Sequence, residues 1–188
     1  MGFNYTPNLM ESFIVQINLL NLKDSASIIL IGGNDSYLAE CLLEKGFKNI
    51  TILDESVSDQ RKKKTGLGEM ASEIKWVICK VSDYVPVRQF DLWCDCTTFF
   101  MLNKQVLIDQ YVETAKKVVS GFIIISTFSE YGCREYNGLV VKHYKEYDLS
   151  DLFKSDFIKF KSIKADQATS YNLNQNFLVS ILKHKSEQ

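Results

Sequence analysis

A glycine turn followed by an acidic residue is the pattern in this sequence whose residue types and spacing best suit chemistry. Gly32 and Gly33 follow a run of aliphatic residues, and Asp54 follows the next such run, 22 positions after Gly32. Gly32 allows a tight turn, and a carboxylate at this distance suits the two hydroxyl groups of a ribose. The loop therefore predicts a nucleoside site, although a helix cap at Asp35 and a solvated Asp54 fit this loop equally well.

The charge of this loop narrows the class of ligand. Asp35 stands at the expected start of the next helix, where a carboxylate repels phosphate but caps the helix. A pyrophosphate would need a full glycine set and a free helix N-terminus, so an NAD-dependent oxidoreductase is disfavoured. A cationic nucleoside without phosphates is compatible with the loop, and S-adenosylmethionine is such a ligand.

Short aliphatic runs alternate with helical patterns, which predicts a parallel sheet covered on both faces. We expect an α/β three-layer sandwich with a Rossmann-like, mostly parallel seven-stranded sheet and an antiparallel edge strand. Strands 27–31 and 121–127 are expected to be central neighbours, and Val106, Ile108 and Val112 to face inward. The expected strands are residues 27–31, 49–53, 75–79, 90–94, 121–127, 157–163 and 177–182, and the expected helices are residues 8–20, 37–45, 56–72, 103–118 and 147–153.

The chain is expected to form a single domain over residues 1–188, with an N-terminal helical segment (1–22) and a core (27–183). Ligands of such sheets bind beyond the carboxyl ends of the strands, where the strand order reverses. The candidate site therefore consists of the segments that follow the expected strands, namely residues 32–36, Asp54, residues 80–83 and residues 94–99.

Taken in order, these segments resemble the class I S-adenosylmethionine-dependent methyltransferases. The likeness is strongest to small methyltransferase-domain proteins whose first loop reads D-L-G-C-G-D-S. The matching stretches here are LIGGNDS (30–36), LDES (53–56) and FDLWCDC (90–96), the last against a family pattern of roughly F-D-L-W-H-D-R. The resemblance extends over residues 27–182.

The resemblance implies S-adenosylmethionine as the cofactor and a small molecule or a protein as the methyl acceptor. It implies acceptor contacts at Phe99, Phe100 and Tyr131, and a catalytic or orienting role for Asp95. The cofactor-binding residues that it implies are Gly32, Gly33, Asn34, Asp35, Asp54, Glu55, Lys80, Val81, Ser82 and Cys94.

Three positions depart from the family pattern. Leu30 stands where the family has an acid for the methionine ammonium, and Asn34 stands at its second glycine. Lys80 replaces the acid that would bind the adenine amino group, and a lysine cannot accept a hydrogen bond. Each lost contact costs about 1–3 kcal/mol, so cofactor binding is expected to be weak. A non-catalytic methyltransferase-fold protein, acting as a binding or regulatory partner, is the alternative.

Composition limits the partners of the chain. Its 22 basic and 23 acidic residues give a net charge of −1, which disfavours a long nucleic acid, and the basic run 61–64 is expected to be a solvated helix face. No apolar run reaches the roughly 20 residues of a membrane helix, and no signal peptide is visible. Five cysteines in mostly apolar segments favour a cytoplasmic setting. Cys94 and Cys96 do not suffice for a metal site, because neither histidine is close in sequence.

Overall fold

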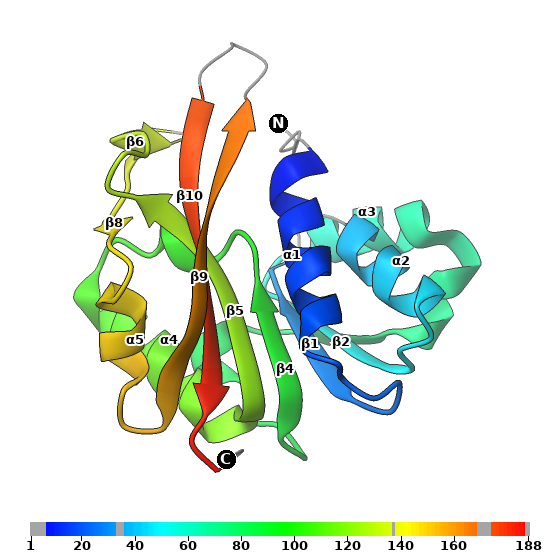
Figure 1. The fold of residues 1–188 in the computed structure, drawn as a ribbon. Coiled ribbons are helices and arrows are strands. Elements are labelled where there is room, and N and C mark those ends of the chain that lie inside the picture. Colours follow the sequence, from blue (N-terminus) through cyan, green and yellow to red (C-terminus); the bar gives the residue numbers. More distant parts are fainter. Residues whose placement is uncertain (1–6, 33–35, 137, 169–173, 187–188) are drawn as a thin grey trace.

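The computed structural model describes residues 7–32, 36–136, 138–168 and 174–186, and most of its strands form one twisted sheet (Figure 1). Seven strands pair in the order β3-β2-β1-β4-β5-β10-β9, and the short β8 pairs with β5. A separate hairpin consists of β6 (Glu135–Tyr136) and β7 (Leu139–Val140). The sheet strands are β1 (Ser27–Ile31), β2 (Asn49–Asp54), β3 (Lys75–Ile78), β4 (Phe90–Asp95), β5 (Val119–Ser129), β8 (His143–Tyr144), β9 (Phe157–Ala168) and β10 (Asn174–His184).

The strand order reverses at β1, which is parallel to β2 on one side and to β4 on the other. This confirms the mostly parallel α/β sheet and places the switch point where the first glycine turn begins. The expectation that β1 and β5 are neighbours is wrong, because β4 lies between them. A continuous apolar run indicates a strand buried on both faces, but it does not indicate which strand lies beside it.

The antiparallel pairing expected at one edge of the sheet is present. β10 runs antiparallel to both β5 and β9, and β9 occupies the edge position. Near the first residue of β5, Gly121 has no room for a side chain, because an added Cβ would lie 2.2 Å from the backbone oxygen of Asp91. This close approach coincides with a register shift in the β4–β5 pairing between Phe90 and Leu92.

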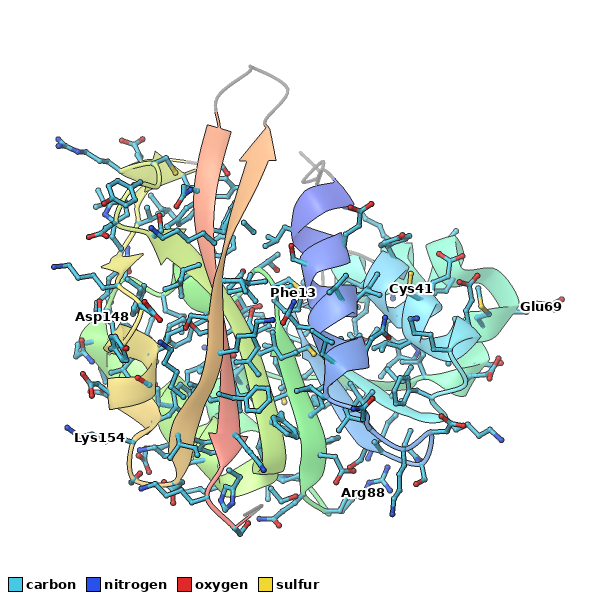
Figure 2. The ribbon with its side chains drawn as sticks, viewed as in Figure 1. Phe13, Cys41, Glu69, Arg88, Asp148 and Lys154 are labelled. Atoms are coloured by element: carbon cyan, nitrogen blue, oxygen red, sulfur yellow. The ribbon has the colours of Figure 1, made fainter. Side chains whose placement is uncertain are left out.

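Helices cover both faces of the sheet. Alternate residues of β1 point to opposite faces, so Ile28 belongs to the hydrophobic core that includes residues of α1, α2 and α3, while Ile29 belongs to the core that includes residues of α4 and α5. Figure 2 shows Phe13 of α1 over the sheet, and Glu69, Asp148 and Lys154 at the periphery of the molecule. The helices are α1 (Pro7–Leu19), α2 (Ser36–Glu44), α3 (Val57–Leu67), α4 (Gln105–Val118) and α5 (Asp148–Phe153).

Two helix predictions need correction. The segment expected as one helix over 56–72 is α3 followed by a 3₁₀ helix (Gly68–Glu73), because Gly68 has φ 56° and ends the α-helix. In α4, Ile108 and Val112 face the core as expected, but Val106 is 58% exposed. Residues two positions apart point to nearly opposite sides of a helix, so Val106 and Ile108 do not share the buried face.

Candidate functional site

A cavity of about 520 Å³ lies at the carboxyl ends of β1, β2 and β3 and beside the turn after β4. This is the edge where ligands of parallel sheets bind, and the volume is typical of a small-molecule site. Its walls come from the first glycine turn, the ends of β2 and β3, the turn after β4 and one face of α4. The lining residues are Ile31, Gly32, Leu53, Asp54, Glu55, Cys79, Lys80, Val81, Ser82, Thr97, Thr98, Met101, Leu102, Leu107, Gln110 and Tyr111.

The cavity brings together most of the cofactor-binding residues that the sequence predicts and the structure describes. Gly32, Asp54 and Glu55 lie at the ends of β1 and β2, and residues 80–82, which follow β3, also line the cavity. Cys94 is not among the lining residues; it is buried in β4, and burial raises the pKa of its thiol. The remaining predicted residues, Gly33, Asn34 and Asp35, lie outside the described residues.

Gly32 adopts a conformation that other residues rarely tolerate. Its φ is +67°, and an added Cβ would lie 2.0 Å from the hydroxyl oxygen of Thr98. Its N–H donates to the carbonyl of Leu53 at 2.8 Å. The turn after β1 therefore packs directly against the turn after β4.

We expect Gly32→Ala to lower the free energy of unfolding by about 1–3 kcal/mol, because a side chain is strained at positive φ. Gly46 provides a matched control: its φ is +91°, and an added Cβ meets no atom closer than 3.9 Å. Urea unfolding should show a smaller loss of unfolding free energy for Gly46→Ala, because positive φ strains both variants but only Gly32→Ala also crowds Thr98. An equal loss in the two variants would mean that crowding by Thr98 does not contribute to the destabilisation.

Asp54 is 8% exposed, and its carboxylate accepts hydrogen bonds from two residues that follow it in the chain. Oδ1 accepts the N–H of Ser56 at 2.9 Å, and Oδ2 accepts a hydrogen bond from the ammonium of Lys63. The same ammonium donates to the carbonyl oxygen of Gly32. Asp54 is therefore a cavity residue in a buried ion pair, and not the solvated loop acid of the alternative interpretation.

Lys63 is a residue of this site that the sequence analysis did not single out. Residues 61, 62 and 64 of the basic run are exposed as expected, but Lys63 is only 5% exposed. Its spacing was the available signal, because Gln60, Lys63 and Leu67 form the buried face of α3. A lysine on the inward face of a helix needs a partner, and Asp54 is that partner.

Asp95 lies behind the cavity wall and is fully buried. Oδ1 accepts the N–H groups of Thr97 and Thr98 at 2.9 and 2.7 Å, and Oδ2 accepts the N–H of Phe99 at 3.0 Å and the hydroxyl of Tyr111 at 2.6 Å. Burial raises the pKa of Asp95 to about 6, although these hydrogen bonds favour the charged form. The carboxylate of Asp95 does not line the cavity, and its expected catalytic or orienting role stays a prediction.

The expected acceptor residues do not line the cavity. Phe99 and Phe100 are fully buried and begin a 3₁₀ helix (Phe99–Met101). Their rings pack on opposite faces of the sheet, Phe99 against Tyr111 at 4.9 Å and Phe100 against Phe128 at 4.9 Å. These phenylalanines therefore anchor the turn after β4, and their expected contacts with a methyl acceptor stay a prediction.

Tyr131 also lies away from this cavity. It is 68% exposed, and the ammonium of Lys164 lies 5.0 Å from its ring centroid. The turn after β4 instead contributes Thr97, Thr98 and Met101 to the cavity. Thr97 and Thr98 lie in the predicted site segment 94–99, whereas Met101 lies beyond it.

Leu30 and Asp83 are also placed by the structure. Leu30 is buried in the core between the sheet and the first helices, so it does not touch the cavity. Asp83 accepts a hydrogen bond from the Ser82 hydroxyl at 2.9 Å and is likewise not a lining residue. The charged residues that the resemblance implies for the cofactor and that the structure describes are Asp54, Glu55 and Lys80, and all three line the cavity.

In the part of the chain that the structure describes, no cluster of three or more histidine, cysteine, aspartate or glutamate side chains has the arrangement of a metal site. Nor is any helix there long and apolar enough to cross a membrane.

Comparison with known proteins links this arrangement to a fold. No protein-family model and no curated protein matches the sequence. The structure is similar to the N-methyltransferase NodS from Bradyrhizobium japonicum WM9, with a TM-score of 0.72 and 14% identity over 94% of this chain and 96% of that chain. The chain has the class I methyltransferase fold.

Two further structures support this methyltransferase fold. An S-adenosylmethionine-dependent methyltransferase from Clostridium acetobutylicum gives a TM-score of 0.70 at 12% identity, over 94% of this chain and 90% of that chain. The Burkholderia thailandensis 1,6-didemethyltoxoflavin-N1-methyltransferase, solved with bound 1,6-didemethyltoxoflavin and S-adenosylhomocysteine, gives a TM-score of 0.69 at 18% identity, over 94% of this chain and 78% of that chain. These identities are low, so the likeness extends to the fold of this chain and not to its substrates.

Proposed function

We propose that this chain is an S-adenosylmethionine-dependent methyltransferase whose acceptor is a small molecule or a protein side chain. The observation that carries the proposal is Asp54, a carboxylate at the carboxyl end of β2 that lines the cavity beside Gly32 at the switch point of a methyltransferase fold. When bound, S-adenosylmethionine supplies a methyl group activated by its sulfonium.

We also propose a cytoplasmic location for the protein. Its support is that the five cysteines are free thiols.

The cavity residues fit this cofactor in chemical type. Each carboxylate oxygen has two lone pairs, and Ser56 and Lys63 occupy one on each oxygen of Asp54, which leaves acceptors for a ribose diol. Val81, Leu102 and Leu107 supply apolar surface for an adenine ring. Lys80 cannot accept the hydrogen bond that the adenine amino group donates. We therefore assign the role of acceptor to the Ser82 hydroxyl or to backbone carbonyls of residues 80–82.

Tyr111 presents its ring to the cavity but not a free hydroxyl. The hydroxyl accepts from the indole N–H of Trp93 at 2.7 Å and donates to Asp95 at 2.6 Å. Burial raises the pKa of Tyr111, so it does not serve as a general base near neutral pH. The contribution of these residues to catalysis is positioning: Asp95 and Trp93 fix Tyr111, and Tyr111 fixes one wall of the cavity.

Calorimetric titration with S-adenosylmethionine and S-adenosylhomocysteine tests the proposal. Because Lys63 offsets Asp54 and Lys80 offsets Glu55, these four charges cancel beside a cationic ligand. We therefore expect S-adenosylmethionine to bind no more tightly than the neutral S-adenosylhomocysteine. No binding of either compound at millimolar concentration would overturn the proposal.

We expect Lys80→Gln to strengthen the binding of S-adenosylmethionine by roughly threefold to tenfold, since partly screened like charges repel by about 1 kcal/mol. The affinity for S-adenosylhomocysteine should change by less than about twofold, because that ligand lacks the sulfonium charge. An equal gain for both ligands in titrations at low salt would show that Lys80 acts by its size and not by its charge.

The alternative is a methyltransferase-fold protein that binds a partner without transferring a methyl group. Its support is the internal pairing of Asp54 with Lys63, together with the lysine at position 80. The titration separates the two proposals, because a non-catalytic partner protein does not require affinity for S-adenosylmethionine.

A further inference from the structure

Lys63 belongs to α3, and its side chain crosses from that helix to the ends of two strands. Its ammonium donates to the Gly32 carbonyl at the end of β1 and to the Asp54 carboxylate at the end of β2. Both of these partners line the cavity, whereas Lys63 itself does not. The ammonium therefore supports the cavity wall from behind and does not occupy ligand space.

A gain in the stability of the fold does not by itself account for this ion pair. The side chains of Lys63 and Asp54 are only 4% and 9% exposed, so both charged groups lose most of their hydration. Replacing a buried ion pair with apolar residues of similar volume is often neutral or stabilising, so such a pair is weak evidence for stability. Its specific effect here is geometric, because one ammonium connects the first glycine turn to the acid at the end of β2.

We propose that Lys63 is a positioning residue that orients the Asp54 carboxylate toward the ribose hydroxyls of the ligand. The inference rests on the proposed function, since it concerns the same site. Ser56 fixes one carboxylate oxygen and Lys63 fixes the other, so the remaining lone pairs have defined directions. A carboxylate that is already oriented loses less conformational freedom when the diol binds.

The experiment measures how much of the affinity depends on the diol. S-Adenosylhomocysteine and its 2′,3′-dideoxy analogue are titrated by calorimetry into the full chain and into Lys63→Met. The matched control is Lys62→Met, which removes the same charge from a side chain that is 80% exposed one residue away. A second variant, Lys63→Gln, retains a hydrogen-bond donor but has a shorter side chain than lysine. Thermal melts confirm that each protein is folded at the titration temperature.

We expect the wild type and Lys62→Met to prefer the diol by about tenfold or more, since each hydrogen bond to a charged group contributes about one decade or more. In Lys63→Met and Lys63→Gln the preference should fall to about threefold or less. A loss of overall affinity with an unchanged preference would indicate a merely structural lysine and overturn the inference. Tighter binding in Lys63→Met would also overturn it, because the lysine would then compete with the ligand.

These outcomes separate the inference from the proposed function. If the wild type binds with a preference for the diol and the Lys63 variants retain that preference, only the positioning role fails. If the wild type binds neither compound, the proposed function fails, and the inference fails with it. If the wild type binds both compounds equally, Asp54 does not contact the diol, and the positioning role is overturned.

Discussion

Asp54→Ala is expected to lose both stability and cofactor affinity. Removing the carboxylate leaves the ammonium of Lys63 buried with only the Gly32 carbonyl, and breaking a buried ion pair in this way costs about 3–5 kcal/mol. The affinity for S-adenosylhomocysteine should fall by about tenfold or more, because two hydroxyl groups lose their charged acceptor. Chemical denaturation and calorimetric titration measure the two effects separately.

The double variant Asp54→Ala with Lys63→Met distinguishes the two effects. It contains no unpaired buried charge, so most of the lost free energy of unfolding should return, whereas the affinity should stay low. If Asp54→Ala alone were as stable as the wild type, the carboxylate and the ammonium would not form a buried pair in solution.

Asp95→Asn is expected to destabilise the protein by about 2–3 kcal/mol at pH 7, because an amide nitrogen cannot accept from Phe99 and Tyr111 as Oδ2 does. The size of this loss should depend on pH. Burial raises the pKa of Asp95 from 3.8 to about 6 in the folded state, so folding favours the protonated carboxyl. The stabilisation from this proton is complete below about pH 4 and is lost as the pH rises through about 6.

The wild type should therefore exceed Asp95→Asn by about 1 kcal/mol more at pH 5 than at pH 7. Urea unfolding of both proteins at the two pH values measures this difference, and other carboxylates cancel because they are common to both. Tyr111→Phe serves as a control that removes one hydrogen bond but leaves the titrating carboxyl. A difference between the wild type and Asp95→Asn that does not change with pH would contradict the raised pKa.

The local sequence was sufficient to predict the longer strands, the approximate helices and the edge of the sheet where the site lies, but not the short strands β6, β7 and β8 or the end of α3 at Gly68. β1 was predicted with its observed bounds, because four consecutive aliphatic residues indicate a strand buried on both faces. Gly32 and Asp54 were predicted at the site for a similar reason. Both come directly after such strands, and the carboxyl ends of parallel strands lie at one edge.

Contacts between distant segments were decided only by the tertiary structure. The sequence shows that Phe99 and Phe100 are apolar and follow a strand, which is compatible with either a ligand contact or a core contact. The structure packs them on opposite faces of the sheet. The choice depends on how α4 and β5 are placed around the turn, and local hydrophobicity does not contain that information.

By itself, the sequence determined that this chain alternates buried strands with amphipathic helices and carries a glycine turn and an acid at two strand ends. Those properties follow from hydrophobic periodicity and backbone geometry, which act over a few residues. Only the tertiary structure decided that β4 separates β1 from β5, that Asp95 lies behind Tyr111 and that Lys63 reaches Asp54. These depend on side chains from separate elements meeting in a shared interior, where a buried charge or hydroxyl must find a partner that lies elsewhere in the sequence.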